Sequence, residues 1–309
     1  MREFFEQRDF LEVTTPVLNP WSTPEPFLHP FEVSAAVAGP RSSDAKTGNQ
    51  PLSLITSPEF NLKILWAHLR HNIFEIAHSF RDQERGDLHS SEFLMLEWYM
   101  SGDVDQTLAL ILELIQRCQN IVQAGETLEM QQVTVEELFS ERLGSGLSYE
   151  ELQMQCLNRG HFRNDASERR YEEYFFTLFL NYLEPEFPSE KILIVRDYPS
   201  ELAAYAKIEN GVGRRFEVYW KGLELANGYA ELQDASEQKR RMIEEAALKQ
   251  KLTGKETTLP AAFLSALESP GLPEGCGVAL GLDRLLMALT GARRLREISP
   301  FPAIPDVLE

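Results

Sequence analysis

The chain has 309 residues and a formal net charge of −18, and hydrophobic residues make up 43% of it. This length allows one large domain or two small ones, with enough chain to bury a core. The acidic balance disfavours broad nucleic-acid binding, because that binding gains its affinity mainly from Lys and Arg contacts to phosphate. A cationic small substrate or a basic protein surface suits the charge better.

The sequence also argues against membrane insertion and secretion. No apolar run approaches the roughly 20 residues that a membrane helix needs, and residues 1–6 are charged rather than apolar. The three cysteines, Cys118, Cys156 and Cys276, are too widely spaced for a metal-ligand pair, and a disulfide framework is not expected. We therefore expect a cytoplasmic protein that is not bound to a membrane.

In the first part of the chain, short strands precede one strong amphipathic helix. Ser57 is the expected N-cap of a helix whose first residue is Pro58, since each residue suits that position. The predicted elements are a helix over 1–9, a strand over 11–18 with Pro16 at an edge or interface, an irregular stretch over 19–52 with a short strand at 33–38, a helix to about residue 70, a hairpin of strands 73–81 and 92–100, and a helix over 104–122.

Helices are inserted between hairpins in the rest of the chain. The predicted elements are helical segments over 133–182, a strand over 191–196, a hairpin over 214–231 turning at 221–222, a charged helix over 234–251, a short strand over 276–281 and a helix over 282–290. Strands grouped in hairpins predict an α+β fold, a largely antiparallel sheet flanked by helices. We expect a single domain over residues 1–309.

Charged residues occur on strands of the first hairpin that are apolar on both faces, which predicts a covered sheet. Period-two alternation places Glu75 and Arg81 on one face of the first strand, and Phe93 and Glu97 on one face of the second. Buried charges are normally paired or liganded. Two interpretations stay open: an internal Arg–Glu ion pair, or an anion site at Arg81 beside a cation site.

Two carboxylates lie on the hairpin over 214–231. With a two-residue turn, Tyr219 is expected opposite Glu224, and Ala226 opposite Glu217. The two acids then lie diagonally on one face, an arrangement that suits Mg²⁺ when phosphates supply the remaining ligands. The alternative is a solvated hairpin with scattered acids.

Strict alternation would put Asn227 and Glu231 on the opposite face of that hairpin. A bulge at 227–228 could re-aim both side chains, and we adopt it as an assumption. Further along, residues 275–284 (GCGVALGLDR) carry three glycines before a helix, where the backbone can approach a ligand and the helix start favours an anion. The glycine spacing fits neither a Rossmann fingerprint nor a P-loop.

Three segments resemble, in order, the three motifs of the class II aminoacyl-tRNA synthetases. They are residues 10–16 (FLEVTTP), residues 79–84 with 92–99 (SFRDQE and EFLMLEWY), and residues 279–284 (ALGLDR), and together they span nearly the whole chain. Residues 56–59, 93–99 and 224–232 resemble the lysine-specific branch, and still more its short paralogues, the elongation factor P lysyltransferases. The paralogues fit better for two reasons. No anticodon-binding OB-fold is expected before the first motif, and Ala279 resembles the alanine of the paralogues rather than the glycine of lysyl-tRNA synthetases.

The resemblance implies roles for individual residues. Arg81 would hold the α-phosphate and the substrate carboxylate. Arg284, the second catalytic residue, would lie across the adenine or on the γ-phosphate. Phe93 would stack on adenine, and Glu217 and Glu224 would hold Mg²⁺. The implied ATP-binding residues are Arg81, Asp82, Gln83, Phe93, Glu224, Leu225, Gly281 and Arg284. The implied substrate-binding residues are Ser57, Pro58, Glu59, Glu97, Tyr99, Asn227 and Glu231, of which Glu59 would bind an amino group and Glu97, Tyr99 and Glu231 the distal ammonium.

The second motif departs from the family pattern at two positions. Gln83 stands where Glu is usual, so the charge is lost while a carbonyl acceptor remains. Ser90 stands where Asn is usual, so a nucleotide contact is either lost or made by Ser90. The implied chemistry needs no protein nucleophile, so the histidines need no catalytic role. We expect His78 to point away from Arg81 and to be a packed core residue.

The resemblance implies that ATP and Mg²⁺ are the cofactors and that lysine or (R)-β-lysine is activated as an aminoacyl-adenylate. The acyl group would then pass to a lysine of elongation factor P, in an enzyme that is a homodimer through its first motif. Two alternatives stay open. One is a lysine–tRNA charging enzyme, which the acidic charge and the missing anticodon domain disfavour. The other is a non-catalytic paralogue acting as a binding or regulatory subunit.

Overall fold

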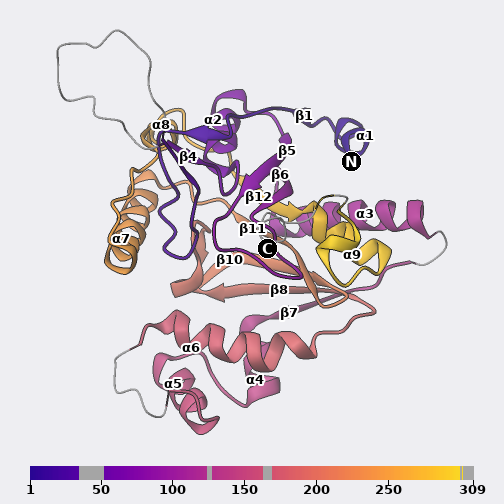
Figure 1. The fold of residues 1–309 in the computed structure, drawn as a ribbon, viewed down its shortest axis with the longest axis vertical. Helices are drawn as coiled ribbons and strands as arrows, with labels where there is room; N and C mark the ends of the chain where they lie inside the picture. The colour runs from indigo at the N-terminus through magenta and orange to yellow at the C-terminus, as the bar shows by residue number, and fades with distance from the viewer. Residues whose placement is uncertain (35–51, 124–126, 163–168, 300, 302–309) are drawn as a thin grey trace. The chain divides into compact units, whose positions relative to one another are not determined.

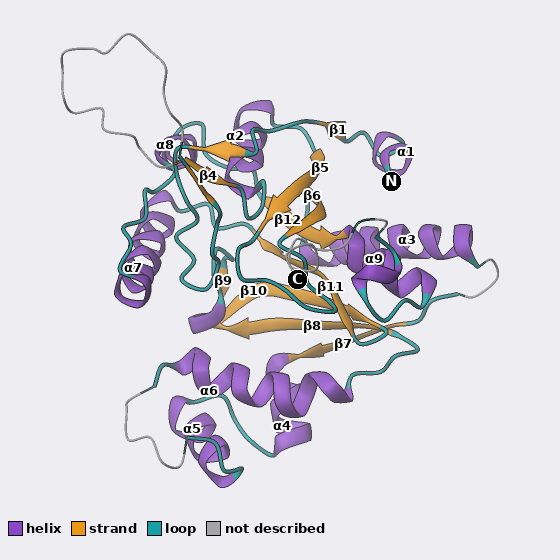
Figure 2. Cartoon of the chain, viewed as in Figure 1, coloured by secondary structure: helices purple, strands orange, loops and turns teal. Residues whose placement is uncertain are grey.

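A computed structural model describes residues 1–34, 52–123, 127–162, 169–299 and 301. The chain divides into two compact units, Met1–Gly102 with Gln233–Glu309, and Asp103–Leu232. Both units contain strands and helices (Figures 1 and 2). Among the described residues, none of the helices has the length and apolar character needed to cross a membrane.

In the first unit, four strands are paired side by side. Strand β1 (Leu11–Glu12) runs parallel to β5 (Ile73–Phe80), which is antiparallel to β6 (Glu92–Ser101), and β6 is antiparallel to β12 (Gly275–Gly281). A second small sheet joins β2 (Leu18–Asn19), β4 (Leu52–Leu54) and β3 (Glu32–Val33). The hairpin predicted over 73–100 is confirmed.

The strand predicted over 11–18 is wrong in its middle, where β1 and β2 are separate strands of different sheets. The interruption includes Pro16, which has no N–H to donate to a sheet. Only the first part of the strand predicted at 33–38 can be compared, because residues 35–38 lie outside the described residues. Strand β3 ends at Val33.

The helices of the first unit are α1 (Arg2–Glu6), α2 (Glu59–Leu69), α7 (Ala235–Thr253), α8 (Ala261–Glu268) and α9 (Leu282–Thr290), with a short 3₁₀ turn at Leu295–Glu297. Phe5 of α1 is fully buried, and its ring stacks on Phe74 with the centroids 4.7 Å apart. Helix α2 starts one residue later than predicted, because Pro58 is its N-cap. The hydroxyl of Ser57 still accepts a hydrogen bond from the Glu59 amide at 3.0 Å.

In the second unit, β7 (Met130–Thr134) runs parallel to β8 (Ile192–Pro199), and β8 is antiparallel to β10 (Val212–Trp220). Strand β10 pairs antiparallel with β11 (Leu223–Ala230) and with the short β9 (Ile208–Glu209). The helices are α3 (Val104–Val122), α4 (Val135–Leu143), α5 (Tyr149–Asn158) and α6 (Tyr171–Leu178), which a π-helical turn extends at Phe179–Leu183. Three-residue 3₁₀ turns follow at Glu184–Glu186 and Ser200–Leu202.

Helices α4, α5 and α6 gather beside β7 and β8 over an aromatic core (Figures 1 and 2). Phe175 is fully buried there and stacks on Phe139 and Phe179. The helical prediction for 133–182 is wrong at its start, since residues 133–134 complete β7. That segment pairs with β8, a long-range partner that local periodicity does not reveal. In both units antiparallel strands with flanking helices predominate, as predicted.

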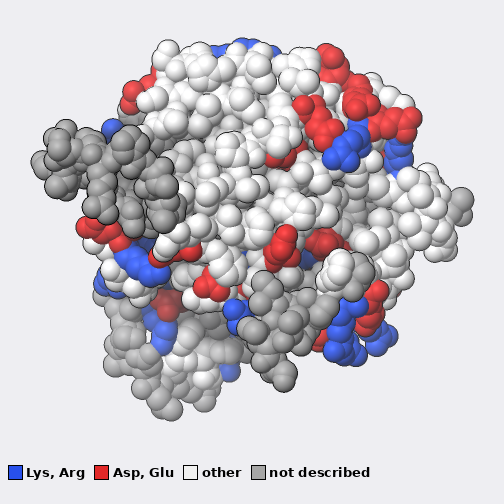
Figure 3. All heavy atoms as spheres, turned by 45° about the horizontal axis from the view of Figure 1, so that its top comes forward, with Lys and Arg blue, Asp and Glu red and all other residues white. Residues whose placement is uncertain are grey.

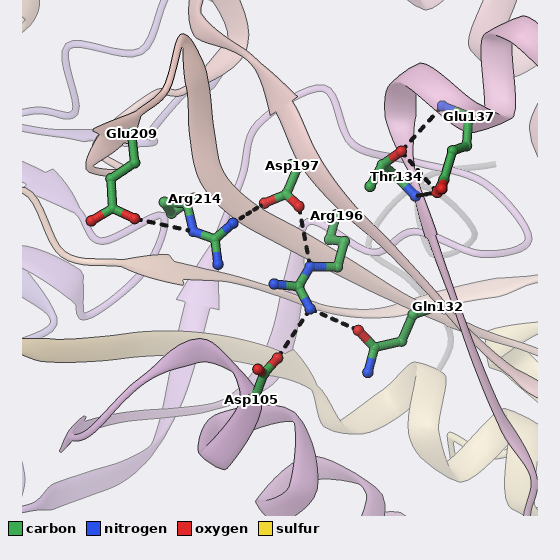
Figure 4. A network of polar contacts seen from close by, with 8 residues as sticks. All are labelled: Asp105, Gln132, Thr134, Glu137, Arg196, Asp197, Glu209 and Arg214. Carbon is green, nitrogen blue, oxygen red and sulfur yellow. Dashed lines mark hydrogen bonds and ion pairs between the residues drawn. The ribbon is translucent and has the colours of Figure 1, made fainter.

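Figure 4 shows how side chains hold an irregularity between β8 and β10. Asp197 has a positive φ of 59°, and its carboxylate bonds Arg214 at 2.6 Å and pairs with Arg196 at 3.4 Å. Arg196 also donates to Asp105 at 3.0 Å and to Gln132 at 2.8 Å, tying α3 and β7 to β8. The same picture shows the Thr134–Glu137 capping box that begins α4.

Candidate active site

A cluster of acidic and hydroxyl side chains lies in the first unit, where α2 begins beside β6. Glu97 is buried on β6 and accepts hydrogen bonds from the hydroxyls of Ser57 and Tyr99, both at 2.7 Å. Because the Glu59 amide donates to the Ser57 hydroxyl, the first turn of α2 is fastened to this carboxyl. Four of the predicted substrate-binding residues are therefore brought together, and Pro58 caps the helix that carries Glu59.

Glu97 sits in an environment that disfavours its negative charge. Burial and then the neighbouring Glu59 raise its pKa to about 8, against the opposing effects of Ser57, Tyr99 and Lys63. Near neutral pH the carboxyl is therefore mostly protonated while no cation is bound. An arriving ammonium group would supply the positive charge that lets it ionise, which suits a receptor for an amine.

Lys63 also belongs to this cluster, although it is not among the predicted site residues. Its side chain is fully buried, and its Nζ atom lies 2.6 Å from Oε1 of Glu59. The available signal was the four-residue spacing from Glu59, which puts both side chains on one face of a helix. Spacing alone could not show that Lys63 is fully buried.

Arg81 follows β5 and lies beside Phe93. Its guanidinium is 5.1 Å from the centre of the Phe93 ring, and its Nη1 atom pairs with Glu84 at 3.3 Å. The Arg–Glu pair considered in the sequence analysis thus exists, but with Glu84 rather than with Glu75 or Glu97. Gln83 is exposed with a φ of 69°, and its amide donates to the Asp82 carboxylate at 2.9 Å.

Arg284 is the third residue of α9, whose N-cap is Gly281. It donates to Nε2 of His89 at 2.6 Å, and burial followed by the Arg284 charge lowers the pKa of His89. His89 is therefore a neutral acceptor for Arg284. Asp283 accepts a hydrogen bond from the Leu94 amide at 2.8 Å, which fixes the start of α9 to β6.

The second unit carries its own acidic group around Glu217 on β10. Its Oε2 atom accepts hydrogen bonds from the hydroxyls of Tyr198 and Tyr219, both at 2.6 Å, and its Oε1 atom pairs with Arg215 at 2.6 Å. The Arg215 guanidinium also lies 4.7 Å from the centre of the Tyr198 ring. A buried carboxylate with three such donors is held in one orientation.

The register of β10 and β11 corrects one prediction about this hairpin. Tyr219 pairs with Glu224 as expected, but Glu217 pairs with Asn227 rather than with Ala226. The irregularity falls between Val218 and Tyr219, so the extra residue of β11 is residue 225 and not part of 227–228. This earlier bulge places Asn227 on the face of Glu217, as the predicted bulge was meant to do, and the amide oxygen of Asn227 lies 3.4 Å from Arg215.

The remaining predicted residues of the second unit follow from that register. Glu224 is half-buried, and Leu225 is buried at the bulge. Glu231 is buried just after β11, where its backbone bridges Ala206. Because side chains alternate along β11 after the bulge, Glu231 lies on the same face as Asn227.

His78 is not a packed core residue, contrary to prediction. Its side chain is exposed on β5, and its Nδ1 atom lies 3.0 Å from a carboxylate oxygen of Glu92. The error has a simple cause: a strand that is apolar on both faces can still expose one position near its end.

On the molecular face of Figure 3, acidic and basic side chains stand beside each other in several places.

Comparison with known proteins shows the family to which this chain belongs. The family model for tRNA synthetases of class II (D, K and N) matches residues 1–305, and the chain therefore belongs to this family. Its relatives include the Elongation factor P–(R)-β-lysine ligase of Proteus mirabilis, 34% identical over 98% of this chain and 91% of the relative. The ligases of the same name from Haemophilus ducreyi and Haemophilus influenzae are 37% and 35% identical, each over 97% of this chain and at least 90% of their own length. The predicted class II synthetase-like fold is confirmed.

Proposed function

We propose that this chain is a ligase that activates (R)-β-lysine or lysine with ATP and transfers the acyl group to a lysine side chain of elongation factor P. The observation that carries the proposal is a group of two acids and two hydroxyls: Glu97 and Tyr99 are buried on β6, and Ser57 and Glu59 are half-buried at the start of α2. Such a group suits the ammonium of a diamino acid. The names of the relatives support the same substrate and acceptor.

In the proposed first step, the substrate carboxylate attacks the α-phosphorus of ATP, forming the aminoacyl-adenylate and releasing pyrophosphate. Arg81 is assigned to the α-phosphate and the attacking carboxylate, and Phe93 to the adenine ring. In the second step the acceptor amine attacks the adenylate carbonyl, and AMP leaves. Positioning and charge stabilisation suffice for this chemistry, so we assign no residue as a covalent nucleophile.

Mg²⁺ is assigned to Glu217 and Glu224, which lie on one face of the β10–β11 hairpin. Oε2 of Glu217 already accepts two hydroxyl hydrogen bonds, whereas Oε1 accepts one bond from Arg215 and keeps one acceptor position. With the half-buried Glu224 this donor set fits a metal that takes one or two carboxylates and completes its shell with phosphate oxygens. When bound, Mg²⁺ would neutralise phosphate charge.

We also propose a cytoplasmic homodimer that does not use tRNA as its acceptor. The exposed apolar side chains of Leu11, Val17 and Leu18 lie in and just after the first motif and support pairing there, with exposed fractions of 46%, 42% and 39%. The net charge of −18 supports a protein acceptor over tRNA.

A pyrophosphate-exchange assay with ATP, Mg²⁺ and either lysine or (R)-β-lysine tests the activation step. We expect exchange with at least one of the two amino acids, and exchange with neither would contradict the proposal. Transfer of labelled lysine is then compared for elongation factor P and tRNA. Label on tRNA alone would make the chain a charging enzyme, and calorimetry showing no ATP binding would make it a non-catalytic paralogue.

A further inference from the structure

Lys63 is an unusual residue to find at a site built for amines. Its side chain has no exposed surface, although it ends in an ammonium group. Its Nζ atom lies 2.6 Å from Glu59 Oε1, 5.9 Å from the centre of the Tyr99 ring and 5.8 Å from that of Phe263. Burying an ammonium is costly unless it is paired, so this position needs an explanation.

Two of the residues that Lys63 contacts, Glu59 and Tyr99, are assigned to the substrate. Glu59 is assigned to an amino group, and Tyr99 donates its hydroxyl to Glu97 at 2.7 Å. The buried ammonium of Lys63 is therefore bonded to Glu59 and lies near the ring of Tyr99, whose hydroxyl holds Glu97. An ordinary helix pair four residues apart is solvent-exposed and contributes little stability, too little to offset the cost of this burial.

We propose that Lys63 is a positioning residue for amino-acid recognition, one that fixes the Glu59 carboxylate and the Tyr99 ring so that Glu59 can receive an amino group of the substrate. This inference rests on the proposed function. A charge-assisted bond at 2.6 Å restricts the rotamers of Glu59 more than solvent would. Without Lys63, Glu59 would lose this bond, and its carboxylate would be held less firmly.

The test measures binding directly, by calorimetry with L-lysine and with (R)-β-lysine, beside the KM values for the amino acid and for ATP. We expect Lys63→Met to weaken amino-acid binding at least about tenfold, while the KM for ATP changes less than about twofold. Lys249→Met is the matched control, because Lys249 is a second buried lysine of this unit that bonds the carbonyl oxygens of Thr23 and Leu28. That control is expected to lose stability but to keep its affinity for the amino acid.

A double-mutant cycle separates positioning from direct contact. If Lys63 acts through Glu59, Lys63→Met has little further effect on binding in a Glu59→Gln background. Effects of the two changes that add, or unchanged amino-acid binding in folded Lys63→Met, would overturn the proposal. If Lys63→Met does not fold, Lys63→Arg is used instead. It keeps the charge but moves its centre, so KM should rise several-fold with kcat retained, and wild-type KM would contradict the idea.

The binding readout also separates this inference from the proposed function. A wild-type protein that binds lysine but shows no pyrophosphate exchange would contradict the activation step, while the Lys63 comparison would still be decided. A wild-type protein that binds neither amino acid would overturn both.

Discussion

Glu75 and Glu97 are directly opposite each other on β5 and β6, and both are buried acids. Glu75 accepts hydrogen bonds from the amide and the hydroxyl of Thr15, both at 2.8 Å, and so ties the segment after β1 to the sheet. Glu97 is held instead by Ser57 and Tyr99, near the second acid Glu59. Burial raises the pKa of both acids. One row of the sheet therefore contains a structural acid and a candidate substrate acid.

Amino-acid binding is expected to release a proton from Glu97. Its pKa of about 8 means that the carboxyl is mostly protonated at lower pH, and a bound ammonium would favour the ionised form. The apparent affinity for lysine should therefore rise about tenfold per pH unit from roughly pH 6 to 8 and level off above that. Calorimetry in buffers with different ionisation enthalpies measures the released proton.

Glu97→Gln and Glu75→Gln form a matched pair for this prediction. The first should weaken amino-acid binding and remove the pH slope, whereas the second should keep both while losing stability. An unchanged slope in Glu97→Gln would show that another group titrates. The raised pKa also predicts that the contribution of Glu97 to stability is present below pH 4.5 and is lost as pH rises through about 8. Thermal unfolding at pH 9 should therefore find Glu97→Gln more stable than the wild type.

Glu84, rather than Gln83, is expected to support ATP binding through Arg81. The Glu84 carboxylate pairs with Arg81, whereas the Gln83 side chain is exposed. Glu84→Gln should raise the KM for ATP by about three- to tenfold, a modest effect because this ion pair is partly solvated. Gln83→Ala is the control, and its KM for ATP should stay within about twofold of wild type. Equal effects of the two changes would show that residue 83 contributes directly.

Glu224 and Tyr198 are expected to affect metal use and stability differently. Glu224→Gln should raise the Mg²⁺ concentration needed for half-maximal pyrophosphate exchange, with little change in the free energy of unfolding. Tyr198→Phe removes a hydroxyl that donates to buried Glu217, and should cost about 1–3 kcal/mol of unfolding free energy. A Mg²⁺ dependence of Glu224→Gln equal to that of wild type would remove this acid from the metal site.

Asp197 is expected to stabilise the second unit by both its charge and its backbone conformation. Asp197→Asn keeps a residue that tolerates positive φ but loses the ion pairs to Arg196 and Arg214, and should cost about 1 kcal/mol. Asp197→Ala should cost about 1 kcal/mol more, since alanine is strained at a φ of 59°. Urea unfolding of both variants measures the difference, and equal losses would assign the whole effect to the charge.

Local patterns determined much of this protein from the sequence alone. The amphipathic period predicted a helix over 104–122, because an apolar stripe repeats there without interruption. Both ends of that helix are confirmed. Alternation and turn residues predicted both long hairpins, and motif order predicted the family. The candidate substrate acids Glu59 and Glu97 follow from the resemblance to the family rather than from a local pattern.

Only the tertiary structure decided features that depend on residues far apart in the chain. Strand β7 exists because it pairs with β8, about 60 residues further along, and the bulge at residue 225 decides which face Asn227 occupies. Glu75 and Glu97 also depend on distant residues. Alternation predicts that both lie on the covered sheet, but only the structure shows that Thr15 bonds Glu75. For Lys63 the sequence shows only its spacing from Glu59, and the structure shows that its side chain is buried.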